Sequence, residues 1–84
     1  MNRMFLLMAE FETTDIPLEK IAEKYLGISI ELANKRANAG KLPIPSFRAV
    51  NSNKAPRLVY VKDLADYLDQ RTAAGREEFK RVNS

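Results

Sequence analysis

Residues 17–43 constrain this chain more than any other stretch, because they contain two helix-length segments separated by a glycine: PLEKIAEKYLGISIELANKRANAGKLP. Within residues 18–26, apolar side chains recur at intervals of three and four, which is typical of one side of an amphipathic helix. The apolar stripe consists of Leu18, Ile21, Ala22, Tyr25 and Leu26. Glu and Lys occupy the opposite side. The spacing therefore predicts a first α-helix that buries one side.

A second short helix is predicted directly after the first. Gly27 suits the left-handed conformation that ends a helix at low cost, and Ser29 is a good N-cap for the next one. Residues 30–39 then form the second helix, which Gly40 and Pro43 bring to an end. Two short helices joined by a tight turn form a helix-turn-helix, whose second helix can enter the major groove of DNA.

The second predicted helix has one side for packing and other sides for binding. Ala33 and Ala37 are small enough to pack closely against the first helix, whereas Asn and Lys on the other faces suit the donors and acceptors of the major groove. The candidate DNA-binding residues of this segment are Ser29, Ile30, Asn34, Lys35, Arg36, Asn38 and Lys41. A single solvated surface helix would look similar, so the flanking segments have to decide.

Two short β-prone runs follow, at residues 46–50 and 57–61, with the turn-rich sequence NSNKAP between them. They predict a β-hairpin. Directly after a helix-turn-helix, such a hairpin is the wing of a winged helix, which lies on the DNA backbone or in the minor groove. The candidate DNA-binding residues of the wing are Arg48, Asn53, Lys54 and Arg57. The alternative is an ordinary surface hairpin with polar turn residues.

The net charge of +3 is unevenly distributed along the chain. Residues 28–62 carry seven Lys and Arg against Glu31 alone, whereas residues 1–27 carry three cations and five acids. Concentrated positive charge on one segment is the electrostatic signature of phosphate binding. A solvated basic face is the alternative.

The two ends of the chain complete the predicted domain. Residues 1–10 (MNRMFLLMAE) form an apolar run that periodicity cannot assign to strand or helix; we expect a strand, buried beneath the hairpin or used in a dimer contact. The stripe at residues 61–68 predicts a third helix from about residue 62 to about residue 74. We expect one domain over residues 1–75 and a charged C-terminal tail over residues 76–84.

The expected fold class is α+β, mainly α: a winged helix-turn-helix with three helices, a wing hairpin and an N-terminal strand. The chain has no Cys and no His, which excludes thiolate zinc sites, Cys–His nucleophiles and imidazole acid–base chemistry. Its carboxylates are scattered and accompany no Gly-rich phosphate loop. We therefore expect no catalytic or metal-binding residues, no cofactor and no small-molecule substrate.

No apolar run approaches the ~20 residues that a membrane span needs, and no signal-peptide cleavage site follows residues 4–9. The sequence accordingly predicts a cytoplasmic protein without membrane contact.

The order of these segments resembles the excisionase and MerR-type winged-helix group: an apolar opening, LEKIAEKYLGIS, a basic helix ending in AGKLP, a polar-tipped hairpin and VYVKDLADYL. Within that group, four stretches together resemble the pyocin activator family of small prophage-associated transcription activators. They are MFLLMAEF, IPLEKIAEKYLG, KRANAGKLPIP and NKAPRLVYVKDLADYLDQR. The resemblance covers about residues 1–71, and the order and spacing of the pieces are more specific than any single piece.

The resemblance implies DNA contacts by six residues: Asn34, Lys35, Asn38, Arg48, Lys54 and Arg57. It also implies a bacterial or phage origin and activation of phage-tail-like gene clusters. MerR-type relatives usually have a large aromatic residue near Arg36, where this chain has a cation that is free to face phosphate or an acidic partner. The partners expected are double-stranded DNA, a second copy of the chain in a homodimer, and RNA polymerase as a further candidate.

Two other functions compete with this interpretation. An excisionase-like protein would bind several adjacent sites and bend DNA without recruiting polymerase. A protein-interaction module would use the same fold to dock an acidic or apolar partner, because fold alone does not determine function.

Overall fold

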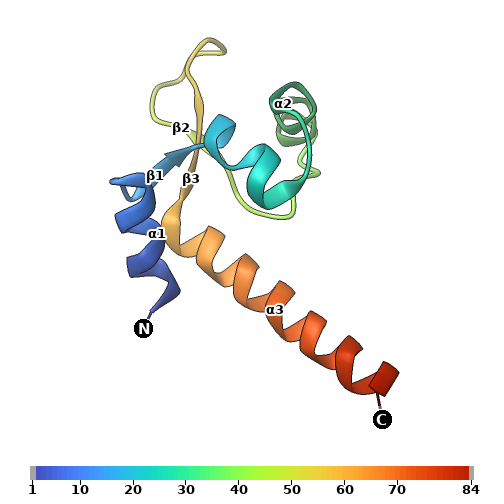
Figure 1. The fold of residues 1–84 in the computed structure, drawn as a ribbon. Coiled ribbons are helices and arrows are strands. Elements are labelled where there is room, and N and C mark those ends of the chain that lie inside the picture. The colour runs from blue at the N-terminus through green and yellow to red at the C-terminus, as the bar shows by residue number, and fades with distance from the viewer. Residues whose placement is uncertain (1, 84) are drawn as a thin grey trace.

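The structure is a computed structural model that describes residues 2–83; Met1 and Ser84, which belong to the predicted N-terminal strand and C-terminal tail, lie outside the described residues. The elements in chain order are α1 (Arg3–Phe11), β1 (Asp15–Pro17), the 3-10 helix η1 (Leu18–Lys20), the π-helix η2 (Ala22–Leu26), α2 (Ile30–Asn38), β2 (Phe47–Arg48), β3 (Arg57–Tyr60) and α3 (Val61–Asn83) (Figure 1). The predominance of helices over one small sheet confirms the predicted α+β, mainly α class.

The N-terminal segment is a helix, so the predicted strand is wrong. The side chain of Asn2 caps α1 by accepting a hydrogen bond from the Met4 backbone N–H at 2.7 Å. Leu7 is 4% exposed, whereas Phe5 is 58% exposed. The residues that face the core recur at helical spacing: Met4, Leu7, Met8 and Phe11. Leu, Met, Ala and Glu favour helices, and the run contains no β-branched residue that would favour a strand.

Residues 18–26 bury the predicted side but do not form a regular α-helix. The 3-10 helix η1 and the π-helix η2 meet at Ile21, whose φ of −117° departs from helical geometry. Leu18, Ile21 and Ala22 are nonetheless completely or almost completely buried. Pro17 pairs with Leu58 in the sheet and fixes where the segment starts. The apolar spacing therefore predicted the buried side correctly and the helix type incorrectly.

Polar and aromatic contacts attach α1 to η2. The Lys24 ammonium forms an ion pair with Glu10 at 2.8 Å, and the Tyr25 hydroxyl donates to the same carboxylate at 2.9 Å. The hydrogen bond from Lys24 holds the pKa of Glu10 below its ordinary value. The Phe11 and Tyr25 rings meet edge to face with centroids 6.2 Å apart. These contacts fix α1 against the segment that precedes α2.

The sheet is antiparallel in the order β1-β3-β2, with β3 in the centre. Ile16 of β1 is paired with Val59 of β3, and both are fully buried. Successive side chains of a strand point to opposite faces, so Arg57 shares the inner face with Val59. This alternation places the Arg57 side chain toward α2 rather than on the outer face of the sheet.

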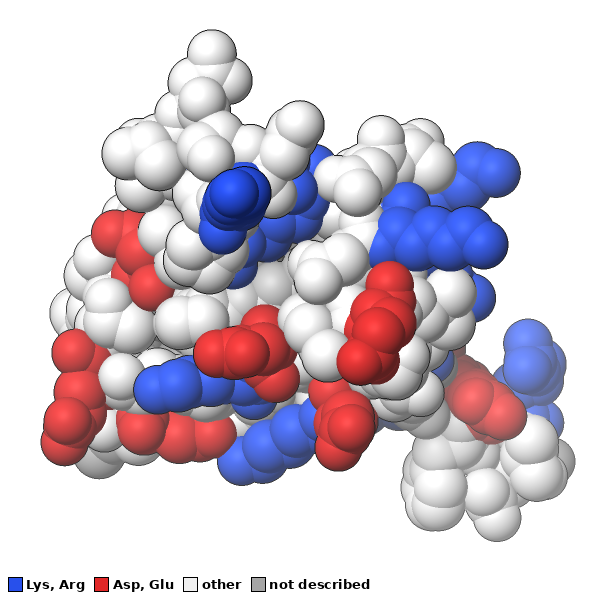
Figure 2. All heavy atoms as spheres, turned by 90° about the horizontal axis from the view of Figure 1, so that it is seen from above, with Lys and Arg blue, Asp and Glu red and all other residues white. Residues whose placement is uncertain are grey.

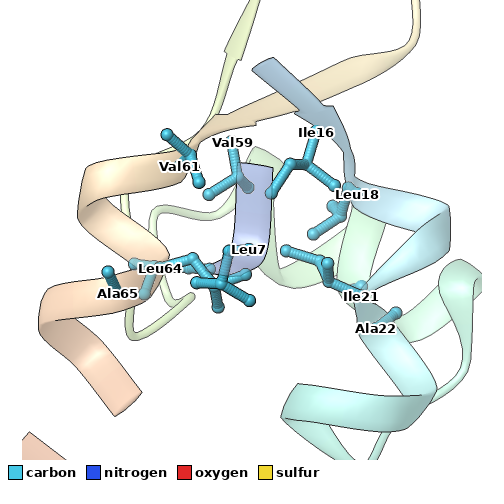
Figure 3. Close-up of a cluster of buried hydrophobic side chains, with 11 residues drawn as sticks. Leu7, Ile16, Leu18, Ile21, Ala22, Val59, Val61, Leu64 and Ala65 are labelled. Carbon is cyan, nitrogen blue, oxygen red and sulfur yellow. The ribbon is translucent and has the colours of Figure 1, made fainter. Parts of the chain in front are cut away.

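One apolar core joins all parts of the fold. Leu7 of α1 lies between α3 on one side and the η1–η2 segment on the other (Figure 3). No polar or charged side chain is buried among residues 2–83. The buried core residues are Leu7, Ile16, Leu18, Ile21, Ala22, Ala33, Ile44, Val59, Val61, Leu64 and Ala65.

The last helix extends further than predicted. It continues through Gly75 to Asn83 and projects from the body of the protein (Figure 1), which gives the molecule extents of 51 × 28 × 16 Å. A single glycine inside a helix costs only about 1 kcal/mol, and good helix formers flank it on both sides. The predicted end near residue 74 is therefore wrong, and the expected boundary at residue 75 falls inside α3.

The first half of α3 is held by α1. Arg3 forms an ion pair with Asp69 at 2.7 Å and donates to the Thr72 hydroxyl at 3.1 Å. Beyond these contacts α3 is exposed along its length. Although α3 has 23 residues, none of the helices between residues 2 and 83 is both long and apolar enough to cross a membrane.

Candidate nucleic-acid interface

Helix α2 is seated on the core by small residues, as its sequence predicted. Ala33 is fully buried, and Ile30 and Ala37 pack against the core from either side of it. The Ser29 hydroxyl caps the helix by accepting a hydrogen bond from the Leu32 N–H at 3.2 Å. Gly27 precedes this cap with a φ of 69°, which confirms the predicted left-handed turn. Ser29 thus has a structural role that fixes the start of α2.

The polar residues of α2 point in different directions. With about 3.6 residues per turn, Asn34 and Asn38 share one flank, Lys35 points away from the core, and Arg36 lies on the opposite flank. All four are exposed, and so is Lys41, which follows the helix. The candidates of α2 therefore form two separate surfaces.

A groove separates α2 from the hairpin. Its volume is about 380 Å³, and it is lined by Pro17, Leu18, Glu19, Ile30, Asn34, Asn38, Arg48, Asn53, Lys54, Ala55, Pro56 and Arg57. Seven of the eleven predicted DNA-binding residues belong to this lining. The other four lie outside it: Ser29, Lys35, Arg36 and Lys41. Glu19 of η1 is the single acid of the lining, and its place there was not predicted.

The hairpin loop that overhangs this groove is held by its own hydrogen bonds. Arg48 and Arg57 are directly opposite in the pairing of β2 with β3, so the loop comprises residues 49–56. The Ser52 hydroxyl accepts from the Lys54 backbone N–H at 3.2 Å, and the Arg48 Nε donates to the Ala55 carbonyl oxygen at 3.2 Å. Lys54 is left exposed at the tip.

Arg57 links the hairpin to the end of α2. Its Nη2 donates to Oδ1 of Asn38 at 2.6 Å, and its Nη1 donates to the Ser46 hydroxyl at 3.1 Å. Its Nε is buried and meets no hydrogen-bond acceptor among residues 2–83. Burial, and then the nearby charge of Arg48, hold the pKa of Arg57 below its ordinary value. No local sequence pattern indicates these contacts, because Asn38 and Arg57 are 19 residues apart.

The cations around the groove are not neutralised by ion pairs within residues 2–83. Ion pairs join Arg3 to Asp69, Lys24 to Glu10, Lys62 to Asp66 and Lys80 to Glu77. Within the described part of the chain, none of the ion pairs involves Arg48, Lys54 or Arg57. Like charges directly opposite on neighbouring strands repel each other. An anion between Arg48 and Arg57 would therefore be favoured.

The same holds for the outer side of α2, whose Lys and Arg also lack carboxylate partners over residues 2–83. Figure 2 shows blue side chains at the hairpin, in the recess beside α2 and on the outer side of α2, while most red side chains lie lower in the view. Positive side chains thus lie both in the groove and on the far side of α2, with uncharged side chains between them. Such a surface suits a polyanion larger than a single phosphate.

A protein-family model described as "Pyocin activator protein PrtN" matches residues 3–75. The chain belongs to the pyocin activator family. The match confirms the resemblance drawn from the sequence motifs, and it places the chain in a family of regulatory proteins. No curated protein and no solved structure matches the chain. The wider likeness to excisionases and MerR-type proteins stays a prediction.

The region that matches the pyocin activator family contains the whole groove, from Pro17 at the end of β1 to Arg57 of β3, and stops within α3. Hydrogen-bond donors dominate this groove, through three cations and the amides of Asn34, Asn38 and Asn53. No group of three or more acidic residues that would hold a metal ion comes together anywhere in residues 2–83. The chemistry that the arrangement supports is the binding of hydrogen-bond acceptors that carry negative charge.

Proposed function

We propose that this member of the pyocin activator family is a sequence-specific DNA-binding transcription activator of prophage or phage-tail-like genes. In this proposal η1, η2 and α2 act as a helix-turn-helix, with α2 in the major groove and the β2–β3 hairpin as a wing on the backbone or in the minor groove. The supporting observation is the groove between α2 and the hairpin, which gathers three cations that have no carboxylate partner among the residues that the structure describes.

In our proposal, the hairpin and α2, which border the groove, bind different parts of the DNA. A helix in the major groove has a phosphate strand beside it, and in our proposal this strand lies between α2 and the hairpin. Arg48 and Lys54 then supply phosphate contacts, which fix position and affinity without reading sequence. Lys35 and Asn34 on α2 face the bases, where Asn and Lys distinguish base edges.

The proposal predicts that DNA affinity falls steeply with salt. If about four cations neutralise phosphates, the slope of log affinity against log salt concentration is expected to be about −4, because each neutralised phosphate contributes about −0.9. Fluorescence-anisotropy titrations at several salt concentrations measure this slope directly. The duplexes should be upstream DNA of the source genome, located by footprinting, and a shuffled sequence of equal length.

Preference for the upstream duplex over the shuffled one is the result expected of a sequence-specific activator. A slope near zero, or no binding at low salt, would instead favour a protein-interaction module. Several closely spaced footprints within an attachment region would favour an excisionase-like role.

We propose further that the chain acts as a homodimer held by the projecting half of α3. Gly75, Phe79 and Val82 continue the apolar side of the helix beyond its contact with α1, and Phe79 and Val82 are 68% and 72% exposed. Exposed apolar strips of this kind mark protein contacts. A dimer would also supply the two half-sites that a small helix-turn-helix needs for specificity. RNA polymerase is a further proposed partner.

Replacing Phe79 and Val82 by Glu is expected to convert the dimer to a monomer, because the charges would have to be desolvated in the contact. Sedimentation velocity at tens of micromolar measures the change. The matched control, Gln70→Glu with Ala74→Glu, adds the same charge to the opposite side of α3. A wild-type protein that sediments as a monomer, alone and on DNA, would exclude the dimer and leave adjacent monomers as the binding unit.

A further inference from the structure

The hydrogen bond between Arg57 and Asn38 determines which half of the Asn38 amide is available to a ligand. A guanidinium carries only donors, so the group that meets Nη2 at 2.6 Å has to be the oxygen Oδ1. The amide NH₂ therefore points away from Arg57. Asn38 is exposed and lines the groove, which makes its NH₂ a donor at the proposed DNA surface.

We infer that Arg57 is a positioning residue that makes Asn38 a donor to DNA, so that Asn38 binds a hydrogen-bond acceptor and does not make the two-bond contact that recognises adenine. The acceptor is a guanine O6 or N7, because guanine presents two acceptors side by side whereas adenine and thymine present one each, or it is a phosphate oxygen. Recognition of adenine by Asn uses both halves of the amide, with Oδ1 accepting from N6. In this protein a positively charged donor already occupies one of the two lone pairs of Oδ1, which leaves this oxygen a weaker and more crowded acceptor for adenine N6.

Arg57 is held firmly enough to maintain this arrangement. Its second nitrogen, Nη1, donates to Ser46 at 3.1 Å, and its Nε is buried. The pairing of Arg57 with Arg48 fixes the strand from which it extends. Arg48 and Lys54 have no such link to α2. Arg57 thus differs from the other two groove cations, because it acts on DNA through Asn38.

This inference rests on the proposed DNA-binding function, and its test begins with sites selected from randomised duplexes. The sequences selected by the wild type and by Asn38→Ala are then compared. A base position that is preferred by the wild type and no longer preferred by Asn38→Ala is the position that Asn38 contacts. We expect guanine there, and we expect wild-type binding to weaken about tenfold when that guanine is replaced either by 7-deazaguanine, which lacks N7, or by 6-thioguanine, whose sulfur is a poorer acceptor than O6. If Asn38 instead binds a phosphate, Asn38→Ala is expected to keep every base preference. In that case, replacing one phosphate by an uncharged methylphosphonate should weaken DNA binding by the wild type and leave binding by Asn38→Ala unchanged.

Adenine at the lost position would overturn the inference while leaving the proposed function intact. Failure of the wild type to select any sequence would overturn the proposed function instead. The two failures are therefore distinguishable in one experiment.

Asn38→Asp separates the donor role from a merely structural one. A carboxylate still accepts from Arg57, so the thermal midpoint is expected to be unchanged or higher, while DNA affinity falls about tenfold or more because the NH₂ is lost. The control Asn51→Asp adds the same charge to the hairpin loop and reports the general electrostatic effect. Equal losses for the two variants, with the selected sequence unchanged, would contradict a donor role for Asn38.

Substitutions of Arg57 supply the complementary readout. In Arg57→Met, Oδ1 of Asn38 is released, and adenine is expected to be accepted beside guanine at the position that Asn38 contacts. Arg57→Lys keeps a cationic donor, so this variant is expected to keep the guanine preference that Arg57→Met loses. Suppose that the wild type selects guanine at this position and that Arg57→Met is folded. If Arg57→Met then keeps the same base preference, Arg57 does not set the specificity.

Discussion

Replacing Arg48 and Lys54 together by Glu is expected to lower the affinity for DNA at least about a hundredfold. Both residues line the groove, and neither has a carboxylate partner within the described chain. A charge-assisted hydrogen bond contributes about 1.5 kcal/mol or more, and each 1.4 kcal/mol is a factor of ten in affinity. The two new carboxylates would also repel the phosphates. Fluorescence anisotropy on a footprinted duplex measures the loss.

The double variant is expected to stay folded. Lys54 is exposed, and the side chain of Arg48 makes its hydrogen bond to a loop carbonyl rather than to the core. A Glu at position 48 would stand opposite Arg57, where opposite charges across two strands are favourable. Circular dichroism should therefore give the wild-type helix content and a similar unfolding midpoint.

The matched control is Lys20→Glu with Lys80→Glu, which changes the net charge by the same amount at exposed positions outside the groove lining. The control is expected to lose far less affinity, because neither of its positions lines the groove and salt screens charges that do not contact the bound strand. Equal losses for the two pairs would mean that net charge, and not this groove, determines binding.

The sequence predicted those features that depend on neighbouring residues. Gly27 and Ser29 set the turn and the start of α2 through local backbone and capping preferences, and both are found where expected. The spacing of Leu18 and Ile21 predicted the buried side of the segment before α2, even though its hydrogen-bond pattern is not α-helical. Local preferences of this kind survive because the core reinforces them.

The features that the sequence did not predict depend on residues distant in the chain. The contacts of Arg57 with Asn38 and Ser46 require the hairpin to fold back on α2, and no local pattern signals that approach. Gly75 would allow a helix to end, but nothing that follows it in the sequence requires the helix to end there. Seven predicted DNA-binding residues meet in one groove because the hairpin and α2 border the same space.

The register of β3 couples the core to this groove. Val59 is buried against Ile16, and Arg57 lies two residues earlier on the same face of the strand. A shift of one residue would remove Val59 from the core and turn Arg57 to the opposite face. The burial of Val59 therefore also fixes the position of Arg57 beside Asn38, which explains how so small a domain can hold a side chain of the groove in one orientation.

Leu7→Ala is expected to destabilise the protein by about 2–4 kcal/mol, a large part of the roughly 5–10 kcal/mol available to a small domain. Leu7 is 4% exposed and lies between α3 and the segment before α2, so the shortened side chain leaves a cavity that several elements share (Figure 3). Urea unfolding followed by circular dichroism measures the loss.

Phe5→Ala is the control that distinguishes the helix from the strand first predicted for this segment. In a strand, Phe5 and Leu7 would share one face, and both substitutions would be costly. In α1, Phe5 is 58% exposed, so its loss should cost at most about 1 kcal/mol. Similar losses for Phe5→Ala and Leu7→Ala would contradict the helix. The observed burial instead predicts a clear difference, and it predicts that the folded fraction of Leu7→Ala binds DNA normally, because α1 lies outside the groove lining.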